Sequence, residues 1–532
     1  MTHFIEHIEN TLRNAWTRPI LSDFHTRDLS GADIAKGIVS LHCLFRRAGL
    51  EEGTRMAIYG ANSANWAISF LSVNTYHAVA VPLLSDFRPE DATTLVRHSS
   101  ASVLFVQKST WNLMLLEHMP SLRIVISLDD FSILWSVTGD SGSLENAISA
   151  ESVDDLSPDK VHFIPQEDDD LVVINYTSGT TSAPKGVMLT VGNFDANVEF
   201  ALENIPIHGG ERIVSMLPMA HMYGFMFEFI YPMSGGAHVY FLGKTPSPAL
   251  LLGALKEVRP YLLITVPLVM EKIFKNSVRP VVSKKSMKVL LSIPGISQII
   301  LGKIRGKLMD AFGGEVREVI MGGAALNPDV EHWLRRIGLP YTIGYGMTEA
   351  APLLAYEWWE RFVPNSCGKA IAGCEVRIES EDPQHVAGEI QARGKNIMKG
   401  YFNNPEATAM AYTDDGWLRT GDLGVIDADG NIFIRGRSKN MILSSNGQNI
   451  YPEEIEAVIN SLPDVVESVV VSRNGRLTAL VYTGENGPVL SKEALQKINS
   501  RLPAYSRVAD IEMVLKPFEK TPKQSIRRFL YK

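Results

Sequence analysis

The sequence predicts an α/β fold in which a large N-terminal domain, built from parallel and mixed sheets covered by helices, is followed by a small α+β domain. The chain has 532 residues, which is too long for a single hydrophobic core. Strand and helix patterns alternate over the first 110 residues, as expected for a parallel sheet covered by helices. Beyond Arg437 the pattern changes, and the remaining stretch of roughly 95 residues has an ordinary domain size. We therefore expect domains at 1–437 and 438–532.

The opening segment shows the alternation of helix and strand patterns most clearly. Residues 34–48 have the apolar spacing of an amphipathic helix, and residues 55–60 read as a strand that ends in glycine. A second helical pattern covers 63–75, and a second strand pattern covers 78–83. Two strands joined through a helix are typical of a parallel sheet.

Residues 176–186 form a predicted loop between two apolar stretches that read as buried strands. Gly179 and Gly186 let the backbone approach a ligand closely, and Lys185 supplies a mobile positive charge. Hydroxyl donors for phosphate oxygens occur at Thr177, Ser178, Thr180, Thr181 and Ser182. The common ATP loop is excluded, because Pro184 precedes the lysine where that motif needs glycine. We predict an anion-binding loop, and a hydroxyl-rich surface loop is the alternative.

His221 lies in an apolar stretch, where a lone histidine more often packs in a core than takes part in catalysis. The methionines around it are Met216, Met219, Met222, Met226 and Met233. Methionine is soft and adaptable, so these side chains suit a pocket for an aliphatic chain. Ordinary core packing would give the same pattern, and the sequence leaves both interpretations open.

The segment from Lys272 to Met309 contains nine basic residues and no Asp or Glu. An apolar run at 289–301 lies between Lys288 and Lys303. An apolar segment flanked by cations, in a protein of net charge −8, suits the surface of an anionic membrane. The alternative is a buried helix pair joined by a Pro-Gly turn, with its charges in water.

Charge and cysteine content exclude several classes of protein. A net charge of −8 argues against a general nucleic-acid binder, which would carry an excess of Lys and Arg. Cys43, Cys367 and Cys374 include no Cys-x-x-Cys pair, so neither a zinc site nor a disulfide framework is predicted. A reducing cytoplasm is the simplest expected compartment. The first seven residues contain acids and no apolar core, and no apolar run reaches transmembrane length.

Three later stretches carry residues that suit a nucleotide. Residues 318–325 read as a strand entering a Gly-Gly turn, where small side chains would let a flat ring stack on the backbone. Residues 341–349 end in Thr348 and Glu349, and a carboxylate is the hard oxygen ligand that Mg²⁺ prefers. In residues 415–424, Asp422 occupies a Gly-flanked turn in which its carboxylate can accept both ribose hydroxyls.

These motifs resemble those of the acyl-adenylate-forming superfamily, which includes acyl-CoA synthetases, carrier-protein adenylation domains and luciferases. The loop at 176–186 is similar to the superfamily's phosphate loop, Tyr-Thr-Ser-Gly-Thr-Thr-Gly-x-Pro-Lys-Gly, with Ser182 in place of one Gly. The stretch 341–349 resembles its Tyr-Gly-x-Thr-Glu motif. Five motifs match in the expected order. The resemblance implies a large N-terminal domain and a small mobile C-terminal domain.

The resemblance also implies roles for individual residues. Tyr345 would stack on adenine, Thr348 would contact the α-phosphate and Glu349 would hold magnesium. The catalytic residues that the resemblance implies in these motifs are Lys185, His221, Thr348 and Glu349. The residues implied to contact the nucleotide are Thr177, Ser178, Gly179, Thr180, Thr181, Lys185, Gly323, Ala324, Tyr345, Gly346, Thr348, Asp422, Arg437 and Lys439. Lys439 would also be the hinge about which the small domain rotates between two half-reactions.

One position departs from the superfamily pattern. Near the C-terminus most members carry a Lys, in a pattern like Thr-Pro-x-x-Lys-Ile-x-Arg, that reaches the acyl carboxylate and the α-phosphate. This chain has Ser525 at that position. Lys523 lies two residues away, on the same side of a strand, and is the predicted catalytic substitute. Lys520 is the weaker candidate, and a weakened enzyme is the alternative.

The resemblance is greatest to long-chain fatty acid:CoA ligases. It implies that a carboxylic acid reacts with ATP to give acyl-AMP and pyrophosphate, and that a thiol then takes the acyl group. The Met-rich and cationic segments favour a long- or medium-chain fatty acid, with ATP, Mg²⁺ and CoA as cofactors. The alternatives are a ligase that loads an acyl carrier protein in trans and a catalytically weak acyl-nucleotide binding protein. The expected location is cytoplasmic, with 272–309 as the candidate for peripheral contact with the inner membrane face.

Overall fold

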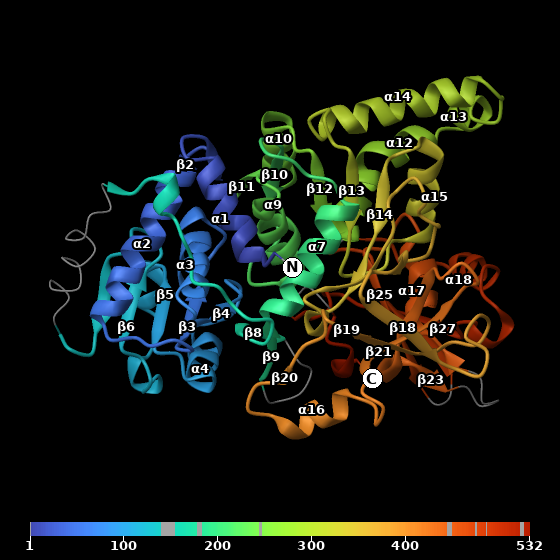
Figure 1. The fold of residues 1–532 in the computed structure, drawn as a ribbon. Helices are drawn as coiled ribbons and strands as arrows, with labels where there is room; N and C mark the ends of the chain where they lie inside the picture. Colours follow the sequence, from blue (N-terminus) through green and yellow to red (C-terminus); the bar gives the residue numbers. More distant parts are fainter. Residues whose placement is uncertain are drawn as a thin grey trace.

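The predicted combination of a large sheet-containing domain and a smaller α+β domain is confirmed (Figure 1). The computed structural model describes residues 2–139, 155–177, 184–243, 247–443, 449–473, 476–485, 487–521 and 526–531. The predicted residues that lie outside these ranges are Ser178, Gly179, Thr180, Thr181, Ser182, Lys523 and Ser525.

The first sheet of the large domain has eight strands in the order β20-β9-β8-β4-β3-β5-β6-β7. The neighbours from β8 to β6 are parallel, and β7, β9 and β20 are antiparallel to theirs. The strands are β3 (Arg55–Tyr59), β4 (Val79–Leu83), β5 (Val103–Val106), β6 (Ile124–Ser127), β7 (Ile133–Ser136), β8 (Leu171–Thr177), β9 (Lys185–Thr190) and β20 (Gly400–Tyr401).

Helices cover both faces of this sheet, because alternate side chains of its strands point in opposite directions. Met56 and Ile58 of β3 join the main core with α2 (Gly31–Arg47) and α3 (Ala64–Thr75). Ala57 and Tyr59 instead join a second core with α4 (Pro89–Ser99). The parallel arrangement predicted for the opening segment is therefore confirmed. The helix predicted from residue 34 begins at Gly31, since Ser30 and Asp33 form a capping box before it.

The second sheet has seven strands in the order β14-β13-β12-β10-β11-β1-β2, and only β1 and β2 are antiparallel. The strands are β1 (Pro19–Asp23), β2 (Arg27–Ser30), β10 (Arg212–Ser215), β11 (His238–Phe241), β12 (Leu262–Thr265), β13 (Glu318–Met321) and β14 (Tyr341–Ile343). Helices around it include α1 (Phe4–Asn14), α7 (Val191–Asn204), α9 (Tyr231–Ser234), α10 (Pro248–Val258), α11 (Pro267–Ile273) and α15 (Pro328–Ile337). Three predicted motifs directly follow the carboxyl ends of strands in this sheet: the His221 stretch after β10, the Gly-Gly turn after β13 and the Tyr345 motif after β14. Ligands of open α/β sheets bind at the carboxyl ends of the strands.

Two smaller sheets complete the large domain. One has three strands, β15 (Tyr345–Gly346), β16 (Leu353–Tyr356) and β17 (Lys369–Ala370). The other is antiparallel and consists of β18 (Cys374–Glu379), β19 (Gly388–Gly394), β21 (Leu418–Ile426) and β22 (Ile432–Arg437). Helix α16 (Pro405–Ala411) lies between β20 and β21 in the chain.

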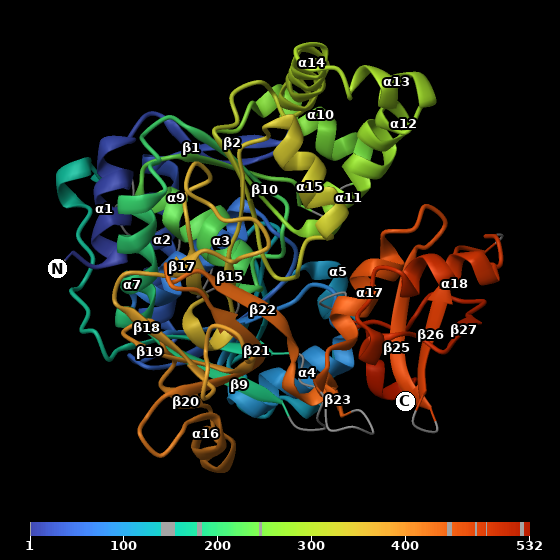
Figure 2. The same cartoon turned by 90° about the vertical axis from the view of Figure 1, so that its right-hand side faces the viewer.

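The small domain, orange to red, lies beside the large one in both views (Figures 1 and 2). Its sheet contains β25 (Glu467–Arg473), β26 (Arg476–Tyr482) and β27 (Asp510–Met513), with helices α17 (Pro452–Asn460) and α18 (Lys492–Asn499). Within the described ranges, no hydrophobic cluster has members on both sides of Arg437. The predicted boundary between residues 437 and 438 lies between the separate cores and stays a prediction.

The cationic segment forms a run of short helices followed by a longer one. After α11 come α12 (Arg279–Val282), α13 (Lys285–Leu290) and α14 (Ile296–Ala311). The alternative of a buried helix pair joined by a Pro-Gly turn is correct in its turn, since α14 begins directly after Gly295, but Val289 and Ile299 are each 63% exposed, so the pair is not buried throughout. No helix in the described part of the chain is both long enough and apolar enough to cross a membrane.

Candidate active site

The β8–β9 hairpin carries the two described ends of the predicted phosphate loop. Thr177 ends β8 and pairs with Lys185, the first residue of β9, so both side chains lie at the mouth of the hairpin. The Lys185 ammonium lies 5.0 Å from the centre of the Tyr401 ring, which is within the range of a cation–π interaction. The predicted lysine is thus held by an aromatic residue from β20, the strand that pairs with β9.

Tyr401 also links this lysine to the predicted magnesium ligand. Its hydroxyl donates a hydrogen bond to Glu349 Oε1 at 2.9 Å. Burial, followed by the charge of Glu349, raises the pKa of Tyr401, so the phenol stays protonated and donating at neutral pH. Sequence reasoning missed Tyr401, because its role depends on the pairing of two strands that lie far apart in the chain.

A second cluster joins the residues predicted to bind adenosine. The hydroxyl of Tyr345 donates to Asp422 Oδ2 at 2.8 Å, and Arg437 Nε lies 2.8 Å from Asp422 Oδ1. The antiparallel pairing of β21 with β22 sets Asp422 directly opposite Arg437. Burial raises the pKa of Asp422 above its ordinary value, and the Arg437 guanidinium opposes that shift. Three residues from separate motifs therefore meet at one buried carboxylate.

Gly346 and Thr348 lie in the turn that follows Tyr345. A Cβ at Gly346 would lie 2.0 Å from the Pro352 carbonyl oxygen, so only glycine allows this approach of β15 to β16. Thr348 is buried at the start of a short 3-10 turn that includes Glu349. The charge of Glu349 contributes to the raised pKa of Asp422, which indicates that the two clusters are electrically close.

The Gly-Gly turn after β13 is packed against the His221 segment. Gly323 has φ +82°, a backbone conformation that favours glycine, and both Gly323 and Ala324 are exposed. A Cβ at Gly322 would lie 3.1 Å from the ring of Tyr223. The Tyr223 hydroxyl donates to the carbonyl oxygens of Thr265 and Ile320, at 3.2 and 3.0 Å. This tyrosine fixes the start of α8 (Met222–Phe225) against the turn.

His221 is the N-cap of α8, and its Nδ1 accepts a hydrogen bond from the backbone N–H of Tyr223 at 3.3 Å. In the neutral ring the proton is then on Nε2. The five methionines near it are all buried and belong to the main core. Their packing agrees with the interpretation as core residues. That they line a pocket for an acyl chain stays a prediction.

Glu228, which sequence reasoning missed, supports the backbone just before His221. It lies in a π-helical turn (Met226–Ile230), and its Oε2 accepts hydrogen bonds from the N–H groups of Met216 and Leu217, at 3.0 and 2.9 Å. Complete burial raises the pKa of Glu228 well above its ordinary value, and the hydrogen bonds from the backbone of Leu217 and Met216 oppose that shift. A single acid within the apolar run 225–230 was the signal available in the sequence.

We expect Glu228→Gln to gain stability relative to the parent as the pH rises. A carboxyl with a raised folded-state pKa contributes fully below its unfolded pKa, and that contribution is lost as the pH rises through the folded pKa. The amide keeps a carbonyl acceptor for the two N–H groups and does not ionise. Between about pH 5 and pH 9 the difference in unfolding free energy should grow by at most about 1.4 kcal/mol per pH unit.

Thermal or urea unfolding of both proteins across this pH range measures the difference. Glu381→Gln, on an exposed side chain, is the matched control and should parallel the parent. Identical pH profiles for Glu228→Gln and the parent would show that Glu228 is ionised in the folded protein.

The predicted hinge lies directly after β22. Lys439 belongs to a 3-10 turn (Ser438–Asn440), and Asn440 Nδ2 donates to Glu453 Oε1 of α17 at 2.7 Å. Other side-chain contacts also join the domains beyond the hinge. They include Arg279 to the Ser461 carbonyl at 3.1 Å, Asn327 to the Ala457 carbonyl at 3.2 Å, and Arg501 with Asp329 at 2.9 Å.

Of the two lysines predicted as substitutes at the C-terminal departure from the superfamily pattern, only Lys520 lies within the described residues. Lys520, the weaker candidate, forms an ion pair with Glu467 of β25 at 2.7 Å. The backbone of Lys520 also forms an isolated antiparallel β-bridge with Ile526. The Lys520 side chain is therefore held at the sheet of the small domain by Glu467. Lys523 lies outside the described residues.

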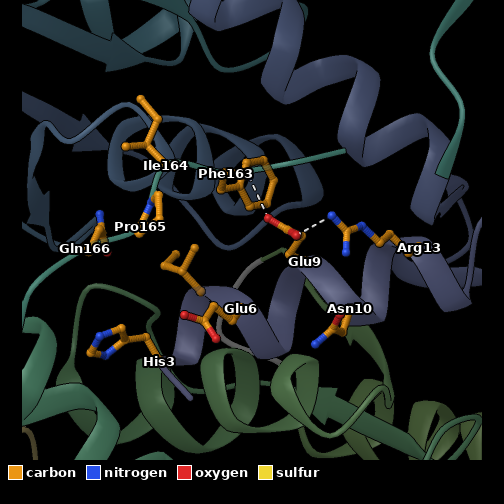
Figure 3. A pocket seen from close by; sticks show the side chains of 10 residues that line it. His3, Glu6, Glu9, Asn10, Arg13, Phe163, Ile164, Pro165 and Gln166 are labelled. Atoms are coloured by element: carbon orange, nitrogen blue, oxygen red, sulfur yellow. Dashed lines mark hydrogen bonds and ion pairs between the residues drawn. The ribbon is translucent and has the colours of Figure 1, made fainter. Parts of the chain in front are cut away.

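A cavity of about 330 Å³ lies elsewhere, between α1 and the segment 163–166 (Figure 3). Glu9 holds this region together, since its carboxylate pairs with Arg13 and accepts the N–H of Phe163. At one end His3 contacts Asp195, whose second oxygen accepts the N–H of Phe4. These contacts anchor α1 to the body of the large domain, and the cavity is lined by none of the predicted nucleotide residues.

Comparison with known proteins gives a family match over most of the chain. The profile of the family described as "AMP-binding enzyme" matches residues 9–402, and that of "AMP-binding enzyme C-terminal domain" matches residues 439–531. The chain is 30% identical over 435 residues to long chain acyl-CoA synthetase 6, peroxisomal, of Arabidopsis thaliana. That match covers 77% of this chain and 62% of the plant protein.

Other relatives are named for fatty acids or for aromatic acids. A long-chain-fatty-acid–CoA ligase of Mycobacterium bovis is 28% identical, with 82% of this chain and 73% of that protein covered. An indoleacetate–CoA ligase of Aromatoleum aromaticum is also 28% identical, with 91% and 88% covered. Among solved structures, ATP-bound MatB from Rhodopseudomonas palustris shares the fold with a TM-score of 0.80 at 22% identity, covering 100% of this chain and 98% of that one.

Proposed function

This chain belongs to the AMP-binding enzyme family, and from that premise we propose that it is an AMP-forming acid–thiol ligase that transfers a long- or medium-chain fatty acid to coenzyme A. The observation that carries the proposal is the cluster of Tyr345, Asp422 and Arg437, close to Glu349. These side chains suit the adenosine part of ATP. Relatives named for long-chain fatty acids support the choice of acid.

The adenosine would be held by the cluster around Asp422. Each carboxylate oxygen has a further lone pair after it has bonded Tyr345 or Arg437, so it can also accept a ribose hydroxyl. The hydrogen bond to Asp422 fixes the position of the Tyr345 hydroxyl, and adenine would stack on the Tyr345 ring. Gly323 and Ala324 are exposed and offer little side-chain bulk.

The phosphates would lie between Lys185, Thr348 and Glu349. The first step brings a carboxylate to a negatively charged phosphate, so aimed donors and cations lower its barrier, and such terms are commonly the largest in catalysis. Lys185 supplies a cation and Thr348 a hydroxyl. The Glu349 carboxylate fits a magnesium ion, because it is a hard oxygen ligand whose position is fixed by Tyr401. Mg²⁺ bound there would neutralise part of the phosphate charge.

His221 would border both the acyl group and the nucleotide. Its ring is oriented by the N–H of Tyr223, and the segment before it is held by Glu228. The adjacent methionines would adapt to an aliphatic chain. A peripheral contact with the inner membrane face belongs to the same proposal, since an acid taken from a bilayer then reaches the enzyme without crossing water.

The proposal is tested by measuring pyrophosphate release and acyl-CoA formation from ATP, CoA and a panel of acids that includes oleate, octanoate and indoleacetate. We expect both products with the fatty acids. Acyl-AMP that passes only to an added carrier protein would identify the carrier-loading alternative. Nucleotide binding without pyrophosphate release would identify a non-catalytic binding protein, and a preference for indoleacetate would overturn the fatty-acid assignment.

In the same assay Asp422→Ala should raise the KM for ATP about 10- to 100-fold, because hydrogen bonds to a charged group are worth roughly 1.5–3 kcal/mol. Asp429→Ala, an exposed acid in the turn between β21 and β22, is the matched control and should leave KM unchanged. Equal effects of the two substitutions would contradict the role of Asp422.

A further inference from the structure

The helices α13 and α14 lie at the edge of the large domain (Figures 1 and 2), and they carry a run of exposed aliphatic side chains that we call the ridge. Its aliphatic side chains are 38–63% exposed and are Val289, Leu290, Ile293, Ile296 and Ile299. They occupy the end of α13, the turn after it and the first residues of α14. A run of large aliphatic side chains in water is unfavourable unless it serves an interaction.

The ridge is separate from the packing that holds α14 in place. Leu308 is buried, and Ile300, Leu301 and Ile304 pack against the main core at helical spacing. Through this inner face α14 contacts α10 and α15. At about 3.6 residues per turn Ile299 lies away from this inner face, and at 63% exposure it is not needed to anchor the helix.

Cations surround the ridge, and acids are absent from the whole of 272–309. Lys284, Lys285 and Lys288 precede it and are exposed. Lys303 and Lys307 are also exposed and follow Ile299 on the outer face of α14, at intervals of four residues. Arg279, by contrast, donates a hydrogen bond to the Ser461 carbonyl of the small domain. The exposed cationic surface therefore covers only part of the segment 272–309.

From this combination we infer that residues 284–307 form a docking surface for an anionic lipid bilayer, with the ridge below the headgroups and the lysines among them. An apolar face flanked by lysines is the pattern of interfacial helices on anionic membranes. The complementarity is local, since the chain as a whole carries a net charge of −8 and would otherwise be repelled. An acidic protein partner would need matching pockets for five flexible aliphatic tips, whereas a bilayer accepts them in any arrangement.

Flotation of the purified chain with vesicles tests the surface without ATP, acid or CoA, so the result is independent of ligase activity. The protein should float with vesicles of phosphatidylglycerol and phosphatidylcholine, and remain in solution with phosphatidylcholine alone. Each lysine near an anionic surface strengthens binding roughly fivefold. Lys284→Glu, Lys285→Glu and Lys288→Glu combined should therefore weaken partitioning about a hundredfold or more.

The matched control combines Lys492→Glu, Lys497→Glu and Lys516→Glu, which changes the net charge equally at exposed sites of the small domain. This control should float like the parent, and cooperative thermal unfolding reports that both variants are folded. Equal losses in the two triple variants, or flotation of neither parent nor control, would overturn the docking surface. The latter result would direct attention to an acidic protein partner.

Insertion of the ridge is tested separately with Ile299→Trp. Its added fluorescence should be quenched by vesicles whose acyl chains carry bromine, because the side chain would reach below the headgroups. A parent that floats while this tryptophan escapes quenching would overturn insertion and leave only electrostatic contact.

Discussion

Replacing Lys523 by Ala should lower the rate of acyl-adenylate formation about a hundredfold while supplied acyl-AMP is still converted to acyl-CoA at the parent rate. During adenylation an ammonium group neutralises charge that develops between the acyl carboxylate and the α-phosphate. Ser525 cannot do this, because a hydroxyl carries no positive charge. Loss of the substitute cation should cost on the order of 3 kcal/mol. Measuring the two half-reactions separately, with radiolabelled ATP and with acyl-AMP, gives the comparison.

Two further variants make the result interpretable. Lys520→Ala is the matched control, since Lys520 is paired with Glu467, and its effect on adenylation should be small. Ser525→Lys restores the superfamily residue and should change the rate little if Lys523 already supplies the charge. A parent rate in Lys523→Ala would exclude this lysine, and a sharp gain in Ser525→Lys would identify a weakened enzyme.

Lys439→Pro should impair one half-reaction by a factor of about a hundred or more and the other by far less. The small domain is proposed to rotate about this residue, so its φ and ψ angles must change between the two steps. Proline fixes φ near −65° and would favour whichever arrangement accepts that angle. The position suits a hinge, because it lies in the short turn that follows β22, next to Asn440, whose side chain bonds Glu453 of α17.

Lys439→Ala separates loss of the side chain from loss of backbone freedom. It should affect the two half-reactions to a similar and smaller extent, although Lys439 is also implied to contact the nucleotide. If the proline variant lost adenylation and thioester formation equally, a hinge at this residue would be contradicted.

Local pattern was sufficient for much of the fold. The spacing of apolar residues located α3, β3 and β4 closely, because those residues must face the two cores on opposite sides of the sheet. Proline suits the first turn of a helix, and α17 does begin at Pro452. Helix α18 ends at Asn499, whose side chain bonds the backbone of Val508.

The candidate site was predictable where a residue's own motif carries its chemistry. Asp422 and Arg437 are separated by a turn signal, and strand pairing then brings them together. Tyr401 had no such signal, because its contacts with Lys185 and Glu349 come from a distant strand. The exposure of the apolar residues in α13 and α14 could not be predicted either, because an apolar pattern does not show whether another part of the protein covers those residues.

The contacts between the two domains have a thermodynamic consequence. They include hydrogen bonds and ion pairs formed by Arg279, Asn327, Arg435 and Arg501. Among the residues with described positions, neither core reaches across the boundary. The heat-capacity change of a rearrangement follows the apolar area it exposes, so rotation of the small domain should proceed with almost none. The balance between the two proposed arrangements would then depend on salt more than on temperature.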